Sequence, residues 1–407
     1  MASQSSSPVS RQAFRFVGYP VRVYAGGEAL DRLGEEADRL RARRVLVVCG
    51  QSVARRTNLL ERVKEALGDR FAGVFDGAQA GSPLPSVDQG VAAARQVGAD
   101  AVIALGGGSA VVTARAITIL LAEGGTVHDH ATRYPPGQPP VSPRLMQPKL
   151  PNIAVLTTPT TAATRSGTAV IDPETGHRLE MFDPKTRPSA VFWDHQALLT
   201  APAGLCRSAA AACFSGVAGG LQSKEAPNPL AQGDLSHALT LLRTNLPLVD
   251  AQADGGAVRV SLCAAAFLYN RAADAGVGGN SLGVVSALAH TLDTRYPQCG
   301  HGAAYSISTA AGMRFNRDHN LAGQARLAAL MGRVPSGLEA SAADWAAEAV
   351  EEFYRGLGLP TRLREAGVPR ADLEHIAQDA MTDFGLHRNV RRVKDVSELV
   401  ELLNGMW

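Results

Sequence analysis

The stretch Ala101–Ser109 (AVIALGGGS) decides the fold of this chain. Five apolar residues run directly into three glycines, and a helical pattern continues behind them. An uninterrupted apolar run is typical of a strand that is buried on both faces of a parallel sheet. Glycines between such a strand and a helix let the backbone approach a phosphate, which the N–H groups and dipole of the helix N-terminus attract. A plain strand-to-helix turn rarely needs three glycines, so we predict a phosphate-binding loop at Gly106, Gly107, Gly108 and Ser109.

The residues around this loop alternate between predicted strands and predicted helices. We expect strands at 21–24, 44–50, 72–75, 153–157 and 189–193, and helices at 29–43, 58–67 and 86–97. A Pro-rich stretch at 133–151 predicts a loop. Such alternation predicts a doubly wound parallel sheet that binds a dinucleotide at the carboxyl ends of its strands.

The second half of the chain has a different character, because it contains helical patterns only. These patterns cover 208–222, 235–246, 257–272, 282–292, 303–314, 343–357 and 372–382. We therefore predict a disordered tail at 1–14, a dinucleotide-binding α/β domain at 15–195 and an all-helical domain at 196–407. The cleft between the two domains is the expected active site.

Composition limits the function. The 407 residues are 45% hydrophobic and 19% charged with a net charge of +2, which is typical of a globular protein of two domains. There is no dense basic stripe and no apolar run that would span a bilayer, so we expect neither a nucleic-acid partner nor a membrane partner. The five cysteines are dispersed and form no CxxC pair, which indicates reduced thiols and a cytoplasmic location.

Two further segments end predicted strands on the side where a nucleotide would bind. Thr157, Thr158 and Thr161 offer hydroxyls there, although a polar strand-end turn explains them equally well. Gly50 ends another strand and is followed by Gln51, with arginines at positions 55 and 56 and no acid for ribose hydroxyls. The arginines fit the 2′-phosphate of NADP, but they fit the solvated start of a helix equally well, so both NAD and NADP remain open.

These segments resemble the iron-containing alcohol dehydrogenase superfamily, whose fold is that of the dehydroquinate synthase-like enzymes. The resemblance runs from Tyr19 to Trp407, and the glycine loop and Thr158–Ser166 carry it most clearly. Many members have Asp where this chain has Val112; maleylacetate reductases lack that Asp as well, so the chain is closer to their branch. The resemblance implies that NAD(P) binds across the glycine loop, with Thr158 and Thr161 near the ribose and nicotinamide. It also implies a small-molecule substrate and a homodimer.

The metal site of the family is largely missing from this chain. The family holds a divalent ion with an Asp or Asn, a His four residues later on the same helix face, and two further His. The resemblance places these ligands at Ala212, Gly216, Ser286 and His301. One imidazole in four positions cannot hold Zn²⁺ or Fe²⁺ at useful affinity, so we expect no metal.

Without a metal, another group has to supply a proton or hydrogen bonds to the oxygen of the substrate. His290 matches a family histidine that lies near the substrate, and His301 is the second candidate. We expect Arg165, Ser286 and Tyr305 to contact the substrate. The alternative for His290 is a helix residue that is hydrogen-bonded to neighbouring backbone.

Three functions remain open at this point. The first is a metal-independent NAD(P)H-dependent reductase of a small carbonyl compound or related electrophile, in a specialised biosynthetic or catabolic pathway, with His290 as proton donor. The second is a non-redox enzyme, such as a cyclase, isomerase or lyase, which the small residues at the ligand positions favour because they enlarge the cleft. The third is a catalytically silent binding subunit, against which the two retained histidines argue.

Overall fold

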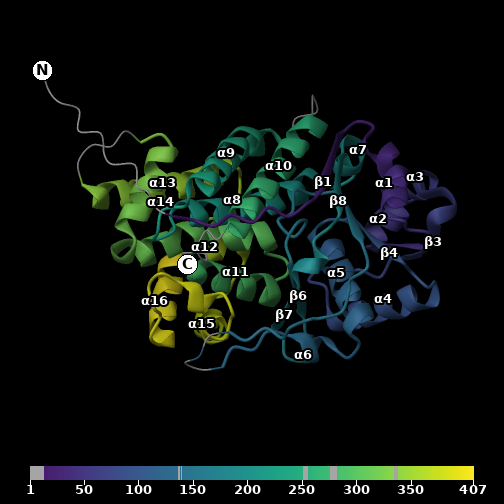
Figure 1. Cartoon of the computed structure of the whole chain (residues 1–407). Helices are drawn as coiled ribbons and strands as arrows, with labels where there is room; N and C mark the ends of the chain where they lie inside the picture. Colours follow the sequence, from purple (N-terminus) through teal and green to yellow (C-terminus); the bar gives the residue numbers. More distant parts are fainter. Residues whose placement is uncertain (1–12, 136–137, 139, 251–254, 276–281, 334–337) are drawn as a thin grey trace, which may run out of the picture.

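The computed structural model describes residues 13–135, 138, 140–250, 255–275, 282–333 and 338–407. An α/β half and a helical half lie next to each other, with the sheet in the first half (Figure 1). Most of the predicted tail at 1–14 lies outside the described residues. The exact domain boundaries stay a prediction.

Six parallel strands form the sheet, in the order β1-β8-β5-β4-β2-β3. They are β1 (Arg22–Gly26), β2 (Val45–Cys49), β3 (Phe71–Phe75), β4 (Ala101–Gly106), β5 (Asn152–Leu156) and β8 (Ala190–Asp194). Every residue of β2, β4, β5 and β8 is buried, as their apolar runs predicted. The predicted parallel, doubly wound sheet is therefore confirmed.

The order of the strands reverses between β2 and β4. The strand that follows β2 in the sequence lies on one side of it, and β4 and β5 lie on the other side. Ligands of such sheets bind outside the carboxyl ends of the strands at this switch point. The loops that begin at Gly50 and Gly106 leave these two strands, so the topology places them together.

Helices cover both faces of the sheet because side chains alternate along each strand. Val45 and Val47 pack with α1 (Leu33–Arg39) and α3 (Leu59–Leu67). Leu46 and Val48 face the opposite side, where α4 (Leu84–Gln96) and α5 (Gly108–Glu123) pack. Shorter helices are α2 (Gln51–Arg56) and α6 (Val127–His130). The helix predicted at 29–43 begins as a 3-10 turn and ends early at Arg39.

A small antiparallel hairpin, β6 (Gly167–Ile171) and β7 (Arg178–Phe182), was not predicted from the sequence. Its turn is stabilised by Asp172, whose carboxylate accepts hydrogen bonds from the Glu174 N–H and the Thr175 hydroxyl. The hairpin lies on the side of the α/β half that faces the helical half (Figure 1). It thereby brings side chains of β7 within reach of α11.

The second half is helical, as predicted, and has a single large apolar core. Its α-helices are α7 (His195–Leu199), α8 (Ala203–Leu221), α9 (Pro229–Asn245), α10 (Gly255–Asp274), α11 (Gly283–Arg295), α12 (His301–Asn316), α13 (Leu321–Leu330), α14 (Glu339–Gly356), α15 (Leu373–Met381) and α16 (Val396–Met406). The prediction missed α7, α13 and α16. Helix α8 packs against α9, α10 and α12, so it lies at the centre of this half.

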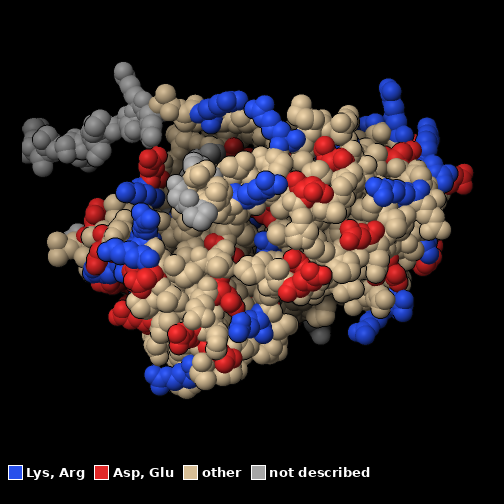
Figure 2. Space-filling view, turned by 90° about the horizontal axis from the view of Figure 1, so that it is seen from below, with Lys and Arg blue, Asp and Glu red and all other residues tan. Residues whose placement is uncertain are grey.

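The surface carries charges of both signs. Figure 2 shows Lys and Arg side chains interspersed with Asp and Glu on the face seen there, in keeping with the net charge of +2. In the part of the chain that the structure describes, no helix has the length and apolar character needed to cross a bilayer.

Candidate active site

The glycine loop connects β4 to the 16-residue helix α5. Gly106 has a φ of +147°, a conformation that L side chains rarely adopt. A Cβ on Gly107 would lie 2.9 Å from the Thr158 hydroxyl oxygen, and one on Gly108 would lie 3.0 Å from that of Thr160. The glycines are therefore needed because residues 157–165, the threonine segment, pack directly against them. Gly107 and Gly108 place no side chain of their own beside the first N–H groups of α5, which suits a phosphate group.

The threonine segment continues β5 and extends towards the helical half. The Thr157 N–H donates to the Gly106 carbonyl (3.0 Å), which keeps the segment beside β4. Thr157 and Thr158 are buried. The Thr161 carbonyl accepts a hydrogen bond from the side chain of Asn270 in α10 (2.7 Å). The segment thus touches the glycine loop at one end and the helical half at the other.

Gly50 follows β2 and lies close to the chain after β3. A Cβ on Gly50 would be 3.0 Å from the Ala78 carbonyl oxygen, so glycine is required there too. Arg55, which the sequence offers to a 2′-phosphate, pairs with Asp76 at 3.3 Å on the surface. A guanidinium beside a carboxylate does not decide between NAD and NADP.

Arg165 lies at the far end of the threonine segment, where it contacts two neighbouring residues of α10. Its Nε donates to Asn270 Oδ1 (3.2 Å), and its guanidinium carbon lies 5.5 Å from the centre of the Tyr269 ring. Asn270 also donates to the Thr164 hydroxyl (2.8 Å). These bonds fix the end of the segment to the helical half, and they leave the Arg165 side chain exposed.

Arg115 of α5 holds the threonine segment through hydrogen bonds to its backbone. Its guanidinium donates to the carbonyls of Ala162 (2.7 Å) and Gly167 (2.8 Å). Burial, together with the positive charge of Arg165, lowers the pKa of Arg115 to about 9. Arg115 is thus a structural support of the threonine segment.

The helix α8 carries the first two lost ligand positions, Ala212 and Gly216, one turn apart and partly exposed. A Cβ on Gly216 would lie 2.7 Å from Cζ of Tyr269 and 2.8 Å from its hydroxyl oxygen. The Tyr269 ring therefore occupies the space that a histidine at position 216 would need. The third position, Ser286, has no charged or imidazole group to offer a cation.

These residues do not fit the metal ion of the family. Over the residues that the structure describes, no group of three or more His, Cys, Asp or Glu side chains is arranged to hold a metal. The decisive observation is that Ala212 and Gly216 have no coordinating side chain, and the Tyr269 ring lies against Gly216. The absence of a metal from the purified protein stays a prediction.

His290 in α11 lies between a carboxylate and a phenol. Its Nδ1 is 3.0 Å from Asp383 Oδ2, and its Nε2 is 3.5 Å from the Tyr305 hydroxyl. The carboxylate can only accept, so Nδ1 carries a proton and Nε2 is directed at Tyr305. Phe384 packs against the imidazole ring with 5.2 Å between centroids. The side chain of His290 is thus held by a carboxylate, in contrast to the backbone partner that was the alternative.

His301 begins α12 and has a similar arrangement. Its Nδ1 is 3.2 Å from Asp293 Oδ2, and Arg178 of β7 donates to the same carboxylate oxygen at 2.8 Å. Burial opposes ionisation of Asp293, but the hydrogen bond from His301 and the charge of Arg178 hold its pKa below the usual value. The ion pair of Arg178 and Asp293 joins the α/β half to the helical half.

Tyr305 stands between the two histidines. Its ring meets the His301 ring edge-on, with centroids 5.0 Å apart and an interplanar angle of 70°. Burial raises the pKa of Tyr305 to about 12, so its hydroxyl stays protonated near neutral pH. Two imidazoles and one phenol therefore form a single proton-bearing cluster, with Asp383 and Asp293 behind it.

The structure brings together most of the residues that the sequence proposed. One group surrounds the glycine loop, and the other contains the two histidines and Tyr305 with Arg165 nearby. Sequence reasoning missed Arg178, Tyr269, Asn270, Asp293 and Asp383. Asp293 could have been proposed as a site residue from the sequence, because it lies three residues after His290 and is therefore its neighbour on the surface of one helix. Arg178 and Asp383 could not, since they come from distant segments.

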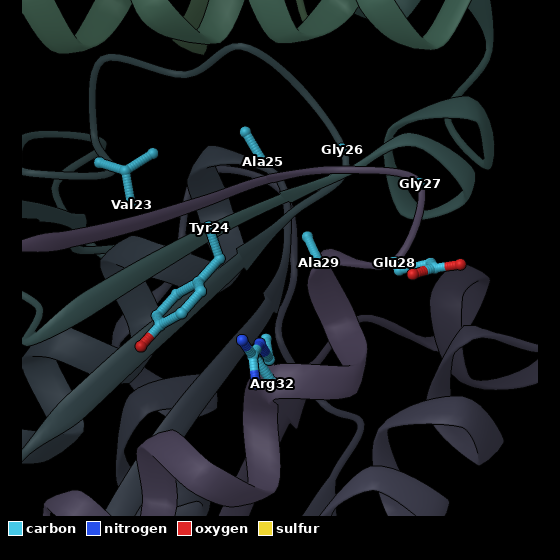
Figure 3. A pocket seen from close by; sticks show the side chains of 8 residues that line it. All are labelled: Val23, Tyr24, Ala25, Gly26, Gly27, Glu28, Ala29 and Arg32. Atoms are coloured by element: carbon cyan, nitrogen blue, oxygen red, sulfur yellow. The ribbon is translucent and has the colours of Figure 1, made fainter.

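A hollow of about 610 Å³ lies elsewhere, at the outer edge of the sheet (Figure 3). Its lining comes from β1 and the turn and 3-10 helix that follow it, from Val23 to Arg32. Arg32 forms an ion pair with Glu35, with 2.7 Å between Nη1 and Oε1. The hollow is wide open and lacks histidine and cysteine, so it offers no acid–base group near neutral pH.

Comparison with known proteins agrees with this arrangement. Residues 20–195 match the family model described as iron-containing alcohol dehydrogenase, and residues 223–407 match the model for the C-terminal part of that family. The chain belongs to the iron-containing alcohol dehydrogenase family. It is an oxidoreductase of that family, as its named relatives are dehydrogenases and reductases.

Relatives cover nearly the whole chain. The NAD-dependent methanol dehydrogenase of Bacillus methanolicus is 28% identical over 392 residues, which are 94% of this chain and 98% of the relative. Maleylacetate reductase 2 of Cupriavidus pinatubonensis is 28% identical over 77% of each chain. Among solved structures, a 1,3-propanediol oxidoreductase superposes with a TM-score of 0.85 at 23% identity, covering 97% of this chain and all of the other. The last likeness shows the shared fold.

The two family matches leave residues 196–222 between them. This interval contains all of α8, including Ala212 and Gly216.

Proposed function

We propose that this enzyme reduces the carbonyl group of a small molecule with hydride from NAD(P)H, without a metal ion and with His290 as the proton donor. The cluster of His290, Tyr305 and His301 carries the proposal. Each histidine is held by a carboxylate, at 3.0 Å and 3.2 Å, and the phenol lies between them. Such a cluster can deliver a proton to an oxygen in the cleft.

The glycine loop supports the nucleotide part of the proposal. Gly106 ends β4, Gly107 caps α5, and Gly108 and Ser109 begin it at the switch point of the sheet. Thr157 and Thr158 lie against this loop, and we assign Gly50 and Thr161 to the same nucleotide site. A pyrophosphate would lie on the uncovered N–H groups of α5. The bound cofactor would supply the hydride. The methanol dehydrogenase relative is named as NAD-dependent, and the exposed Arg55 and Arg56 keep NADP as an equal candidate.

The proton route follows from the hydrogen bonds. Hydride adds to the carbonyl carbon, the π electrons of the C=O bond move to the oxygen, and the oxygen takes one proton. Asp383 keeps the Nδ1 proton of His290 in place, so that the doubly protonated imidazole gives up its Nε2 proton and then regains one from solvent. The Tyr305 hydroxyl lies 3.5 Å from Nε2 and is the group next to it. Asp383 is a positioning residue in this proposal, and His301 is the second acid.

Nucleotide titration is the first test. Protein fluorescence is followed during addition of NADH and of NADPH, and the protein is then given a panel of aldehydes and ketones that includes lactaldehyde and maleylacetate. We expect saturable binding of at least one nucleotide and its oxidation by at least one carbonyl compound. Elemental analysis of the same preparation should find no stoichiometric Zn or Fe.

The other outcomes identify the alternatives. Nucleotide binding without oxidation by any carbonyl compound would favour non-redox use of the cleft. Absence of any nucleotide binding would favour a silent binding subunit and overturn the proposal. Stoichiometric Zn or Fe would overturn its metal-independent part. A homodimer, a cytoplasmic location and a role in a specialised biosynthetic or catabolic pathway accompany the proposal as expectations.

A further inference from the structure

Arg165 is a cation without a carboxylate partner among the described residues. Its Nε donates to Asn270 Oδ1, which is neutral, and no hydrogen bond from its Nη1 or Nη2 is found in that part of the chain. The side chain is exposed although its anchor, Asn270, is buried. The guanidinium is therefore fixed at one end and offers its remaining N–H groups to whatever enters the cleft.

The position of this cation matters because of the ring beside it. The guanidinium carbon is 5.5 Å from the centre of the Tyr269 ring. That same ring fills the space next to Gly216, where the family has a metal ligand. A fixed positive charge thus lies next to the ring that replaces the ligand. Its charge also reaches the Tyr305 hydroxyl, where it works against the effect of burial on the Tyr305 pKa.

We propose that Arg165 is the catalytic cation of this enzyme, in the role of polarising the carbonyl that the family gives to its metal ion. The inference rests on the proposed reductase function and deepens it. As hydride adds to the carbon, negative charge gathers on the oxygen, and the Nη1 and Nη2 protons of Arg165 form hydrogen bonds to it. The guanidinium acts only as a hydrogen-bond donor to this oxygen and gives up no proton. The proton that completes the alcohol comes from His290.

Two other arginines nearby are less suited to this role. Arg178 is paired with Asp293 at 2.8 Å, so its charge is largely balanced. Arg115 is buried, and its guanidinium donates to backbone carbonyls of the threonine segment. Of these three arginines, Arg165 alone combines exposure with hydrogen-bond donors that have no partner among the described residues.

The test replaces Arg165 by Met, which keeps the length of the side chain and removes its charge. The carbonyl compound that the wild type reduces fastest serves as the probe. We expect kcat to fall by about 100- to 1000-fold, as when one donor to a developing oxyanion is removed. The affinity for NADH or NADPH should stay unchanged. In Arg165→Ala, where the shortened side chain leaves space for a free cation, millimolar guanidinium should restore at least about 10-fold of the lost rate.

Arg370 provides a matched control. Its guanidinium carbon lies 5.3 Å from the Trp407 ring and its Nη2 lies 3.4 Å from Asn404 Oδ1, so it has the same two kinds of contact far from the cleft. Arg370→Met should change kcat by less than about 2-fold and should not respond to guanidinium. The rescue is the decisive reading, because a merely structural arginine gives none.

The outcomes separate this inference from the proposed function. If the wild type binds no nucleotide and reduces nothing, the proposed function fails and this inference fails with it. If the wild type is active but Arg165→Met keeps kcat within about 3-fold, or Arg165→Ala loses kcat without rescue by guanidinium, only the role of Arg165 is overturned. Arg165→Gln gives the same readings if the methionine variant does not fold, as judged by circular dichroism.

Discussion

The two walls of the cleft differ in what they are made of. The wall at the carboxyl ends of β2 and β4 presents glycines and helix N–H groups, and it keeps the family pattern. The other wall, on α8, presents Ala212 and Gly216, which have no coordinating side chain, with the Tyr269 ring against Gly216. The first wall works through backbone groups and the second through side chains.

This difference shows how a fold can keep its nucleotide site while the metal site in the same cleft changes. Backbone N–H groups cannot be replaced by mutation, but any added Cβ can block them, so the glycine wall tolerates little change. Side-chain ligands can be lost one residue at a time without disturbing the helix that carries them. A nucleotide site is thus expected to outlast a metal site in the same cleft.

The strongest way to sharpen the comparison is to remove His290 from the second wall. We expect His290→Ala to lower kcat by about 1000-fold, the usual scale for loss of a general acid, while nucleotide affinity stays the same. His237→Ala, at an exposed position on α9, is the control and should leave both unchanged. Steady-state rates and a fluorescence titration measure the two effects. A full rate in His290→Ala would transfer the role of acid to His301.

A side chain in the glycine loop of the first wall should weaken nucleotide binding. In Gly107→Val the added Cβ would lie 2.9 Å from the Thr158 hydroxyl oxygen, so the threonine segment has to move off the loop. We expect NADH or NADPH to bind about 100-fold more weakly, which corresponds to about 2.7 kcal/mol. Gly204→Val is a suitable control because a Cβ there meets nothing within 4 Å. Unchanged nucleotide affinity in Gly107→Val would contradict the assignment of this loop.

A double-mutant cycle tests the packing of the second wall. Glycine in the middle of a helix normally costs about 1 kcal/mol relative to alanine. Gly216→Ala should nevertheless destabilise the enzyme by about 1 kcal/mol, because its Cβ would lie 2.7 Å from the Tyr269 ring. In a Tyr269→Ala background the same change should be stabilising, so the two sites should be coupled by about 1–2 kcal/mol. Urea unfolding of the four proteins measures the coupling, and additive effects would contradict the contact.

The smallest effect is expected from the ion pair that joins the two halves. The pKa of Asp293 is held below its usual value in the folded state, so its contribution to stability is complete above about pH 4 and is lost as the pH falls through the folded pKa. Asp293→Asn should therefore cost about 1–2 kcal/mol at neutral pH and less in acid. The check is chemical unfolding at both pH values, with Asp88→Asn on the exposed face of α4 as control. An equal cost at both pH values would show that the carboxylate charge plays no part.

Much of the fold could be predicted from the sequence. Strands such as Val45–Cys49 are continuous apolar runs because both of their faces are buried, and the glycines after Leu105 mark the loop. The hairpin at 167–182 escaped prediction because its strands are short and half exposed. Helix α13 was also missed, although four of its ten residues are buried.

The candidate site could also be predicted only in part. His290 and His301 could be proposed because the resemblance placed His290 near the substrate and His301 at the fourth ligand position. Their partners Asp383 and Asp293 could not be paired with them, since only the folded chain decides which carboxylate faces which imidazole. The identity of the group that fills the space at Gly216 was equally hidden, because Tyr269 lies on a different helix.

The Tyr269 ring at Gly216 has a consequence outside the cleft. A site that depends on Fe²⁺ has to be loaded after synthesis, competes for a scarce nutrient, and stops working when the ion is oxidised or lost to a chelator. A phenol ring is made with the chain and stays where the chain puts it. A reductase built in this way would be ready as soon as it folds, in cells that are starved of iron or rich in oxygen.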